Sequence, residues 1–288
     1  MAAHGGGVRL PKVLRLGVDA GKKGGDSLEQ LGQQGAFYAR SAVGAPRVVG
    51  RYRKEVMRLL AEVAFGSGAL AVIGGTVVIV VFMTFFTGLE VGQQGYNSLN
   101  SLGAAVYTGF VSAYFNTREI APIIAAIALS ATVGCGFTAQ LGAMRVSEEI
   151  DALETLAVPS VPYLVTTRLI AGFVAVVPLY VLGLLASYAS TQLITTQLFG
   201  QSSGTYSHYF RQFLPHSDIF ISFAKVLVFA VIIILTHCYY GYTASGGPAG
   251  VGVAVGRAVR LAITSVVAVD LLLDLALYGT NVSVRIAG

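Results

Sequence analysis

The segment Arg145-Val-Ser-Glu-Glu-Ile-Asp-Ala-Leu-Glu-Thr-Leu-Ala-Val-Pro159 separates two long apolar runs and carries four of the chain's fourteen acidic residues. An ionised carboxylate inside the hydrocarbon of a membrane costs several kcal/mol, so this segment must protrude into water. A short acidic helix held between two membrane spans is well shaped to be bound by another protein. The segment therefore suggests a membrane subunit that is driven by a partner.

The composition is that of a membrane protein. Hydrophobic residues make up 55% of it and charged residues only 11%, whereas a soluble domain has about 25% charged residues. The apolar residues form runs of around twenty or more, which is the length needed to cross a bilayer. Strands of a transmembrane barrel would instead give short alternating segments. We therefore expect an all-α membrane protein.

The apolar runs predict about five spans. Pro122 is expected to bend or break the helix between a short lead-in helix and the second span, because proline removes a helical hydrogen bond. We expect a polar loop over 88–102, a loop over 195–218, and a glycine-rich turn over 245–252 before the last span. The predicted spans are 63–87, 119–143, 163–192, 219–242 and 260–279.

The N-terminal part divides into two segments ahead of a membrane domain over 61–288. Residues 1–26 are rich in Gly and Lys, a composition typical of disorder. Over 27–60, apolar residues recur at helical spacing between arginines, which predicts an amphipathic helix in the cytoplasmic interface. Basic residues beside a span favour anionic lipid over nucleic acid as their partner.

The distribution of Lys and Arg predicts the orientation. Eleven of the nineteen lie before residue 60, and with five crossings fifteen fall on the same side as the N-terminus. Cytoplasmic segments carry such an excess. We expect a multi-pass protein of the plasma (inner) membrane, with the N-terminus and the acidic segment in the cytoplasm and the C-terminus outside.

Five charged residues fall inside the predicted spans or at their edges. Asp270 and Asp274 are four residues apart and share one helix face. Lys225 lies at a comparable depth, so pairing with one of them would keep these charges in the membrane at least cost. Arg118 and Glu119 could pair likewise or contact a lipid headgroup. An ion pair that fixes helix packing and a role with protons or substrate both stay open.

The acidic segment carries two parallel ridges. Ile150, Leu153 and Leu156 recur at three-residue spacing, beside a ridge of acidic side chains. This pattern suits docking into the groove of a partner, although a solvated loop helix would explain it equally well. The candidate docking residues are Glu148, Glu149, Ile150, Asp151, Leu153, Glu154 and Leu156.

Neither a catalytic nor a cofactor site is expected in this chain. The stretch Gly17–Lys23 lacks the glycine spacing and the final Ser or Thr of a phosphate-binding loop. The histidines have no metal-ligand spacing, and Cys135 and Cys238 sit in apolar runs. If ATP is used, another chain hydrolyses it.

Four blocks of sequence resemble the MlaE/YrbE permease family, the membrane subunits of ABC-type lipid transporters. They cover about residues 60–280 in the family order. The third is similar to the family's cytoplasmic coupling segment. The blocks are Thr84–Gln94, Arg118–Ile127, Gln140–Leu153 continuing through Val158–Tyr163, and Tyr239–Gly252.

The chain is most similar to a B-type actinobacterial YrbE subunit of an Mce complex. Family members often have Gly-Arg-x-Gly where this chain has Ala131–Gly134, and Glu where it has Gln140; such losses suit one member of a non-identical dimer. The resemblance implies a second YrbE-type permease, a separate cytosolic ATPase docked on the acidic segment, and extracytoplasmic Mce substrate-binding proteins. It also implies import of a lipid such as a fatty acid, mycolic acid or sterol.

The resemblance leads us to expect half of a lipid cavity in this chain, formed by the first, second and fifth predicted spans. Two other functions stay open. One is a secondary lipid transporter that works without ATP through Asp270, Asp274 and Lys225, although the internal repeat typical of such folds is not evident. The other is a scaffold that anchors an extracellular tube.

Overall fold

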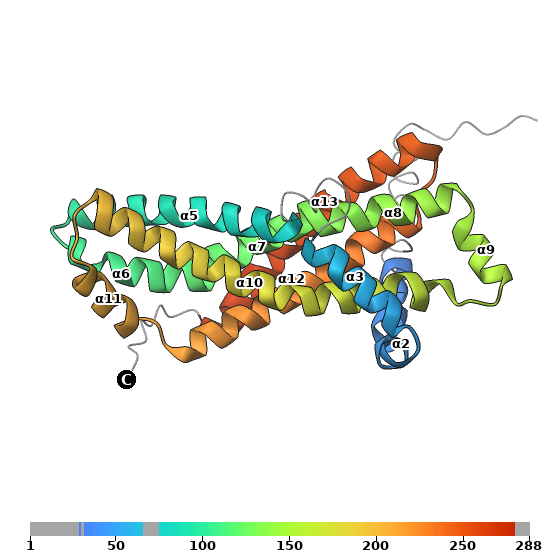
Figure 1. The fold of residues 1–288 in the computed structure, drawn as a ribbon, viewed down its shortest axis with the longest axis horizontal. Coiled ribbons are helices and arrows are strands. Elements are labelled where there is room, and N and C mark those ends of the chain that lie inside the picture. The colour runs from blue at the N-terminus through green and yellow to red at the C-terminus, as the bar shows by residue number, and fades with distance from the viewer. Residues whose placement is uncertain (1–28, 30–31, 66–74, 280–288) are drawn as a thin grey trace, which may run out of the picture.

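The computed structural model describes residue 29, residues 32–65 and residues 75–279. The segment 1–26, for which disorder is expected, lies outside the described residues. The described part is an elongated bundle of helices, without a strand in these ranges (Figure 1). Five helical segments are long and apolar enough to cross a membrane. The prediction of an all-α membrane protein with about five spans is confirmed.

Three of the five spans are single α-helices and two are composite. In the composite spans, η marks a short 3₁₀ or π-helical stretch that continues the α-helix. The single helices are α5 (Gly75–Asn100), α12 (His216–Tyr242) and α13 (Gly247–Tyr278). The second span joins η1 (Ala105–Tyr107), α6 (Thr108–Val111), η2 (Ser112–Ile120), α7 (Ala121–Leu129), η3 (Ser130–Gly134) and α8 (Cys135–Val146), and the third joins η4 (Val161–Thr166), α10 (Thr167–Leu193) and η5 (Ile194–Leu198).

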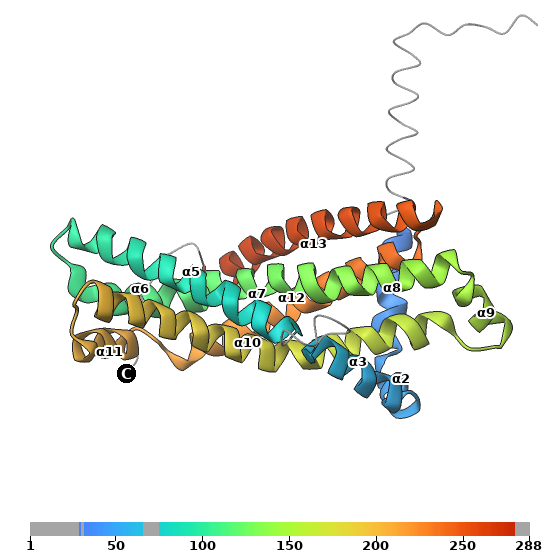
Figure 2. The ribbon, with the colours of Figure 1, turned by 45° about the horizontal axis from the view of Figure 1, so that its top comes forward.

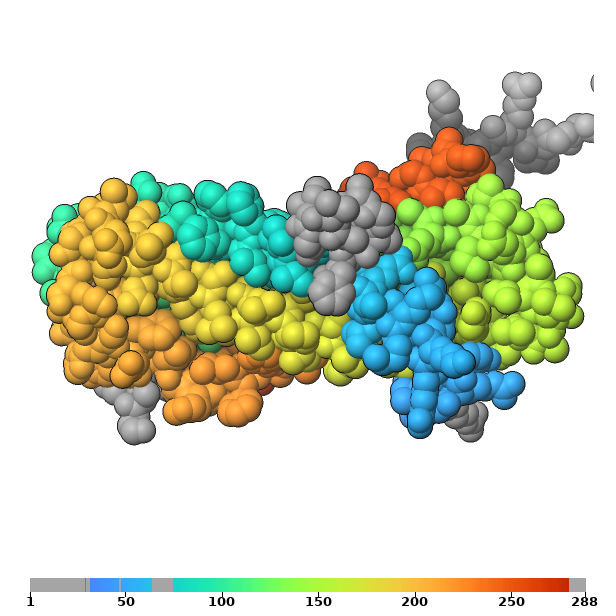
Figure 3. Space-filling view, in the orientation of Figure 1, coloured from blue at the N-terminus to red at the C-terminus, as the bar shows by residue number. Residues whose placement is uncertain are grey.

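Short helices lie at both tips of the bundle. The loop between the second and third spans contains α9 (Glu149–Thr155), and α11 (Ser203–Gln212) covers the opposite tip. Figure 3 shows the surface of α9 forming one extreme end of the molecule. The loop expected over 195–218 is therefore partly helical.

The polar loop predicted over 88–102 is wrong, because α5 stays helical to Asn100. The glycines that suggested a turn are packing positions. A Cβ atom at Gly88 would collide with the Ser190 hydroxyl and the Ser187 carbonyl of α10, and one at Gly92 would meet Thr191 and Ile194. Small residues let membrane helices approach closely, so α5 and α10 pack along much of their length (Figure 1).

The predicted break at Pro122 is also wrong, because the second span is continuous over 42 residues. Pro122 sits in the first turn of α7, just after the π-helical stretch η2. There the Ala121 N–H donates to the Asn116 carbonyl in the wider π-type pattern. Proline leaves the Arg118 carbonyl without its usual helical donor, and the Lys225 ammonium donates to it at 2.7 Å.

The last span begins thirteen residues earlier than predicted, at Gly247 rather than near 260. The turn before it is narrow. Gly246 and Gly247 take φ angles of 89° and 70°, and Pro248 stands in the first helical turn, where its missing N–H is harmless. The span α13 is also the least enclosed by the rest of the bundle. In its most apolar stretch 17% is buried, against 33–56% in the other four spans.

The N-terminal region forms three helical pieces rather than one helix. Residues 32–43 are helical, and α2 (Ala45–Arg51) and α3 (Arg53–Phe65) follow. The helix is interrupted at Gly44 and Pro46, where α2 begins, and again at Tyr52, whose backbone is not helical. The buried Leu59 and Val63 hold α3 against the bundle. The location of this region in the membrane interface stays a prediction.

Candidate functional site

Lys225 lies at the centre of a buried charge cluster where the second, fourth and fifth spans meet. Its side chain is fully buried, and its ammonium lies 2.7 Å from Asp270 Oδ1 and 2.6 Å from Asp274 Oδ1. The ammonium also donates a hydrogen bond to the Arg118 carbonyl at 2.7 Å. Glu119 stays 3.8 Å away and is about one-third exposed.

Arg118 pairs with a residue that the sequence analysis did not single out. Its Nε and Nη2 lie 2.7 and 2.6 Å from Asp218 Oδ2, and both side chains are almost fully buried. The guanidinium also lies between the rings of Tyr114 and Tyr278, at 4.2 and 4.3 Å from their centres. The sequence signal that could have drawn attention to Asp218 is its seven-residue spacing from Lys225, which puts both residues on one helix face.

The cluster holds more negative than positive charge. Two cations, Arg118 and Lys225, face the four carboxylates of Glu119, Asp218, Asp270 and Asp274. Within the described ranges, Glu119, Asp270 and Asp274 are the group whose carboxylate oxygens converge within 4.8 Å, as metal ligands do. The Lys225 ammonium already supplies a positive charge there. The cluster can join three spans electrostatically, and it can respond to a change in protonation.

The acidic loop differs from the predicted pair of ridges. Ile150 is fully buried and Leu153 packs half-buried on the core, while Leu156 is 73% exposed. Ile150 and Leu153 therefore hold this seven-residue helix against the bundle, and Leu156 is the residue of the ridge that remains accessible to a partner. Glu148, at a left-handed φ of 61°, begins the loop helix.

The acidic side chains of this loop divide into two sets. All four are exposed to solvent; among the described residues, Glu148, Glu149 and Asp151 make no bond to the bundle beyond the loop and the end of α8, where Asp151 lies 2.7 Å from Arg145 Nη1. Glu154 turns back toward the bundle, where Ser160 Oγ donates to it at 2.6 Å and the Tyr242 hydroxyl at 3.3 Å. The loop thus presents three carboxylates outward and ties a fourth to the end of α12.

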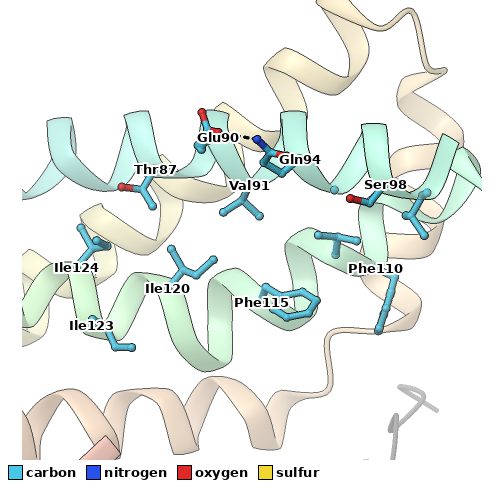
Figure 4. Close-up of a pocket in the computed structure, with 13 residues that line it drawn as sticks. Thr87, Glu90, Val91, Gln94, Ser98, Phe110, Phe115, Ile120, Ile123 and Ile124 are labelled. Carbon is cyan, nitrogen blue, oxygen red and sulfur yellow. Dashed lines mark hydrogen bonds between the residues drawn. The ribbon is translucent and has the colours of Figure 1, made fainter. Parts of the chain in front are cut away.

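An apolar cavity of about 690 Å³ lies between α5 and the second span (Figure 4). Val91 faces Ile120, Ile124 and Phe115 across it, and Glu90 and Gln94 stand on the α5 side, joined by a 3.0 Å hydrogen bond. Apolar walls with a few polar groups at one edge are typical of sites for amphiphilic ligands.

The comparison with protein families identifies this architecture. The family model described as Permease MlaE matches residues 65–276, which include all five spans' apolar cores and the acidic loop. The chain belongs to the MlaE permease family.

The chain is also similar to individual proteins, two of which are named as probable ABC transporter permeases. A probable ABC transporter permease protein of Rickettsia bellii is 32% identical over 181 residues, covering 63% of this chain and 70% of the relative. One of Synechocystis is 33% identical over 184 residues, covering 64% and 69%. The chloroplastic protein TRIGALACTOSYLDIACYLGLYCEROL 1 of Arabidopsis thaliana is 31% identical over 189 residues, covering 66% and 54%.

This MlaE-family chain also contains a polar network that sequence reasoning missed. The Gln140 amide donates to Glu62 of α3, and Arg168 Nη2 donates to Gln140 Oε1 at 3.1 Å. Arg168 Nη1 donates to the Leu164 carbonyl at 2.8 Å. The network links α3, α8 and α10 near the acidic loop.

On the outer side of α3, hydrogen bonds from Arg58 lower the pKa of Glu55 below its ordinary value.

Proposed function

We propose that this chain is a permease subunit of an ATP-driven ABC-type lipid importer of the Mce kind. It forms half of a lipid pathway with a second permease chain, while a separate cytosolic ATPase supplies the energy and extracytoplasmic Mce proteins deliver the lipid. The observation that carries the proposal is the apolar cavity between α5 and the second span. Membership in a permease family supports a role as a transporter subunit rather than an enzyme.

The form of the cavity favours a lipid as its occupant. Its volume of about 690 Å³ lies within the range of ligand pockets, about 300–1,000 Å³. Ile120, Ile123 and Ile124 offer an apolar wall for an alkyl chain or sterol ring, and Gln94 can hydrogen-bond a polar head. Fatty acids, mycolic acids and sterols all fit this description. One relative carries the name of a diacylglycerol galactolipid, which agrees with a lipid substrate.

Coupling to the ATPase is assigned to the acidic loop. Glu148, Glu149 and Asp151 point into solvent at the tip of the molecule and can meet a basic groove. Ile150 and Glu154 fasten the loop to the bundle. A push on the loop would therefore reach α12 through Tyr242, and α12 carries Lys225 nearer its other end. With the N-terminus in the cytoplasm, as the basic residues predict, this tip faces the ATPase.

The second permease chain is assigned to the outward face of α13. This span is little enclosed, and large apolar side chains project from it. A partner chain would cover part of this face, and lipid would cover the rest. The exposed residues include Val267, Leu271, Leu272 and Leu275.

Charge reversal in the loop tests the proposal. Glu149→Lys with Asp151→Lys should abolish co-purification of the ATPase and ATP-dependent lipid uptake, because like charges would then face the ATPase groove. Arg211→Glu on α11, at the other tip, changes the net charge by two units, against four in the loop variant, and should leave ATPase binding intact. Undiminished ATPase binding and uptake in the loop variant would contradict the proposed coupling.

A second candidate function rests on the charge cluster. Lys225 bridges Asp270 and Asp274 within the spans, an arrangement that could carry a proton through a secondary lipid transporter without ATP. Lipid uptake by the isolated chain in liposomes with a proton gradient and no ATPase would favour this function. Uptake that appears only with the ATPase and ATP would exclude it.

A further inference from the structure

A second cavity, of about 950 Å³, lies near the acidic-loop end of the bundle, away from the lipid cavity. It is an open cavity lined by the N-terminal helix 32–43, the end of α12 and the first turns of α13. Figure 2 shows the helix 32–43, in blue, passing beside the start of α13. Nothing in the proposed transport pathway uses this cavity.

The polar lining of this cavity is rich in hydrogen-bond donors and carries one positive charge. Arg257 supplies a guanidinium, Gln33 and Gln34 supply amides, and Tyr240 and Ser245 supply hydroxyl groups. Asp and Glu do not occur among the described lining residues. A cavity with this lining favours an anion over a cation.

The start of α13 lies beside the polar part of this cavity. The helix is 32 residues long, and its N-terminus, capped by Gly246, has no side-chain capping bond. The first N–H groups of a helix lack internal partners and carry a partial positive charge. Ser245 and Gly250 of this helix end line the cavity, although the Gly250 N–H itself donates to the Gly246 carbonyl at 3.3 Å. Phosphate groups are common ligands of such helix ends.

The remaining lining is apolar and lies along α13. Val253, Ala254 and Leu261 extend from the polar part toward the middle of the span. Arg257 precedes the membrane-embedded Asp270 by thirteen residues, about 20 Å along a helix. Arg257 and two tyrosines, Tyr239 and Tyr240, are the residue types that anchor helices at the headgroup level of a bilayer.

We propose that this cavity binds an anionic phospholipid of the leaflet at this end of the bundle. Arg257 and the Gln34 amide hold the headgroup phosphate, while Val253 and Leu261 contact an acyl chain; the Gln33 amide instead donates to Glu29 at 3.3 Å. A free phosphate compound would share the polar contacts and leave the apolar part unused. The bound lipid would fasten the N-terminal helix to α12 and α13, distinct from the lipid that is transported.

The structure offers a matched pair of variants for the test. Arg257 and Arg260 lie three residues apart on the same helix and are both exposed, but only Arg257 lines the cavity. Native mass spectrometry of the full chain in its purified complex, titrated with phosphatidylglycerol, would measure binding. Arg257→Gln should weaken retention of the lipid about tenfold through loss of a charge-assisted contact. Arg260→Gln should change it less than twofold.

Two further measurements keep the proposal falsifiable. Val253→Trp should fill the cavity without a change in charge and should also weaken phosphatidylglycerol retention, even if Arg257→Gln fails to fold. Phosphatidylcholine with the same acyl chains should be retained more weakly. Equal effects of the two arginine variants, equal retention of the two lipids, or displacement of phosphatidylglycerol by inorganic phosphate at equal concentration would each overturn the phospholipid assignment.

Discussion

The Lys225 ammonium donates a 2.7 Å hydrogen bond to the Arg118 carbonyl, the group that Pro122 leaves without a helical donor. Proline therefore creates the acceptor that the buried lysine needs in addition to Asp270 and Asp274. The carbonyl that lacks a helical donor in the second span accepts a hydrogen bond from the ammonium group of the fourth span. This relation explains how Pro122 persists within a continuous membrane helix.

Pro122→Ala should weaken the attachment of Lys225 to the second span. Alanine restores an N–H that competes for the Arg118 carbonyl, so the ammonium keeps only its carboxylate partners. We expect a change in unfolding free energy of about 1 kcal/mol, together with reduced lipid uptake. Thermal unfolding in nanodiscs and uptake assays would measure both. Wild-type uptake in this variant would contradict a functional role for the contact.

Lys225→Met should destabilise the bundle by about 3–5 kcal/mol, because Asp270 and Asp274 would be left without their cation. The triple variant Lys225→Met, Asp270→Asn, Asp274→Asn removes the charges together and should regain most of that loss. Chemical unfolding of the purified complex would measure the difference. If the triple variant is stable but inactive in lipid uptake, the cluster has a role beyond packing. If the single variant is as stable as the wild type, Lys225 does not hold the carboxylates as described.

Arg118→Lys tests the second ion pair of the cluster. Lysine keeps the charge but loses the two-nitrogen contact with Asp218 and the flat stacking between Tyr114 and Tyr278. We expect a loss of about 2 kcal/mol in unfolding free energy. Asp218→Asn should give a comparable loss, and the double variant should lose less than the sum, because the two residues form one interaction. Additive losses would show that they act separately.

The sequence supported the number and type of the spans, because hydrophobic length is a direct physical requirement of the bilayer. The helix boundaries predicted near Gly88, Pro122 and Gly247 were wrong. At these positions glycine or proline allows close packing, or another helix supplies the hydrogen bond that proline removes. Local sequence signals cannot show such tertiary compensation. Asp218 and Glu62 were missed for the same reason, since each gains its role from a partner on a distant segment.

Gly88→Ala should loosen the contact between α5 and α10. The added methyl group would meet the Ser190 hydroxyl and the Ser187 carbonyl, and crowding of this kind costs about 1–3 kcal/mol. Gly136→Ala is the control, because a Cβ atom there meets no neighbour within 4 Å. Thermal unfolding of both variants would distinguish the loss of stability caused by crowding at Gly88 from the change in helix propensity that both substitutions share. Equal stability of the two variants would show that Gly88 is not required for the approach of α5.

Tyr242→Phe should separate ATP hydrolysis from transport. The Tyr242 hydroxyl lies 2.8 Å from Ser160 Oγ and donates to Glu154, so it joins the acidic loop to α12. Phenylalanine removes these bonds and leaves the exposed carboxylates unchanged. The ATPase should therefore still co-purify and hydrolyse ATP, while lipid uptake per ATP falls several-fold. Tyr163→Phe is the control, since it removes a hydroxyl at the same end but keeps the ring contact with Tyr52. An unchanged ratio of uptake to hydrolysis in Tyr242→Phe would mean that force reaches the spans by another route, through Ile150 and α8.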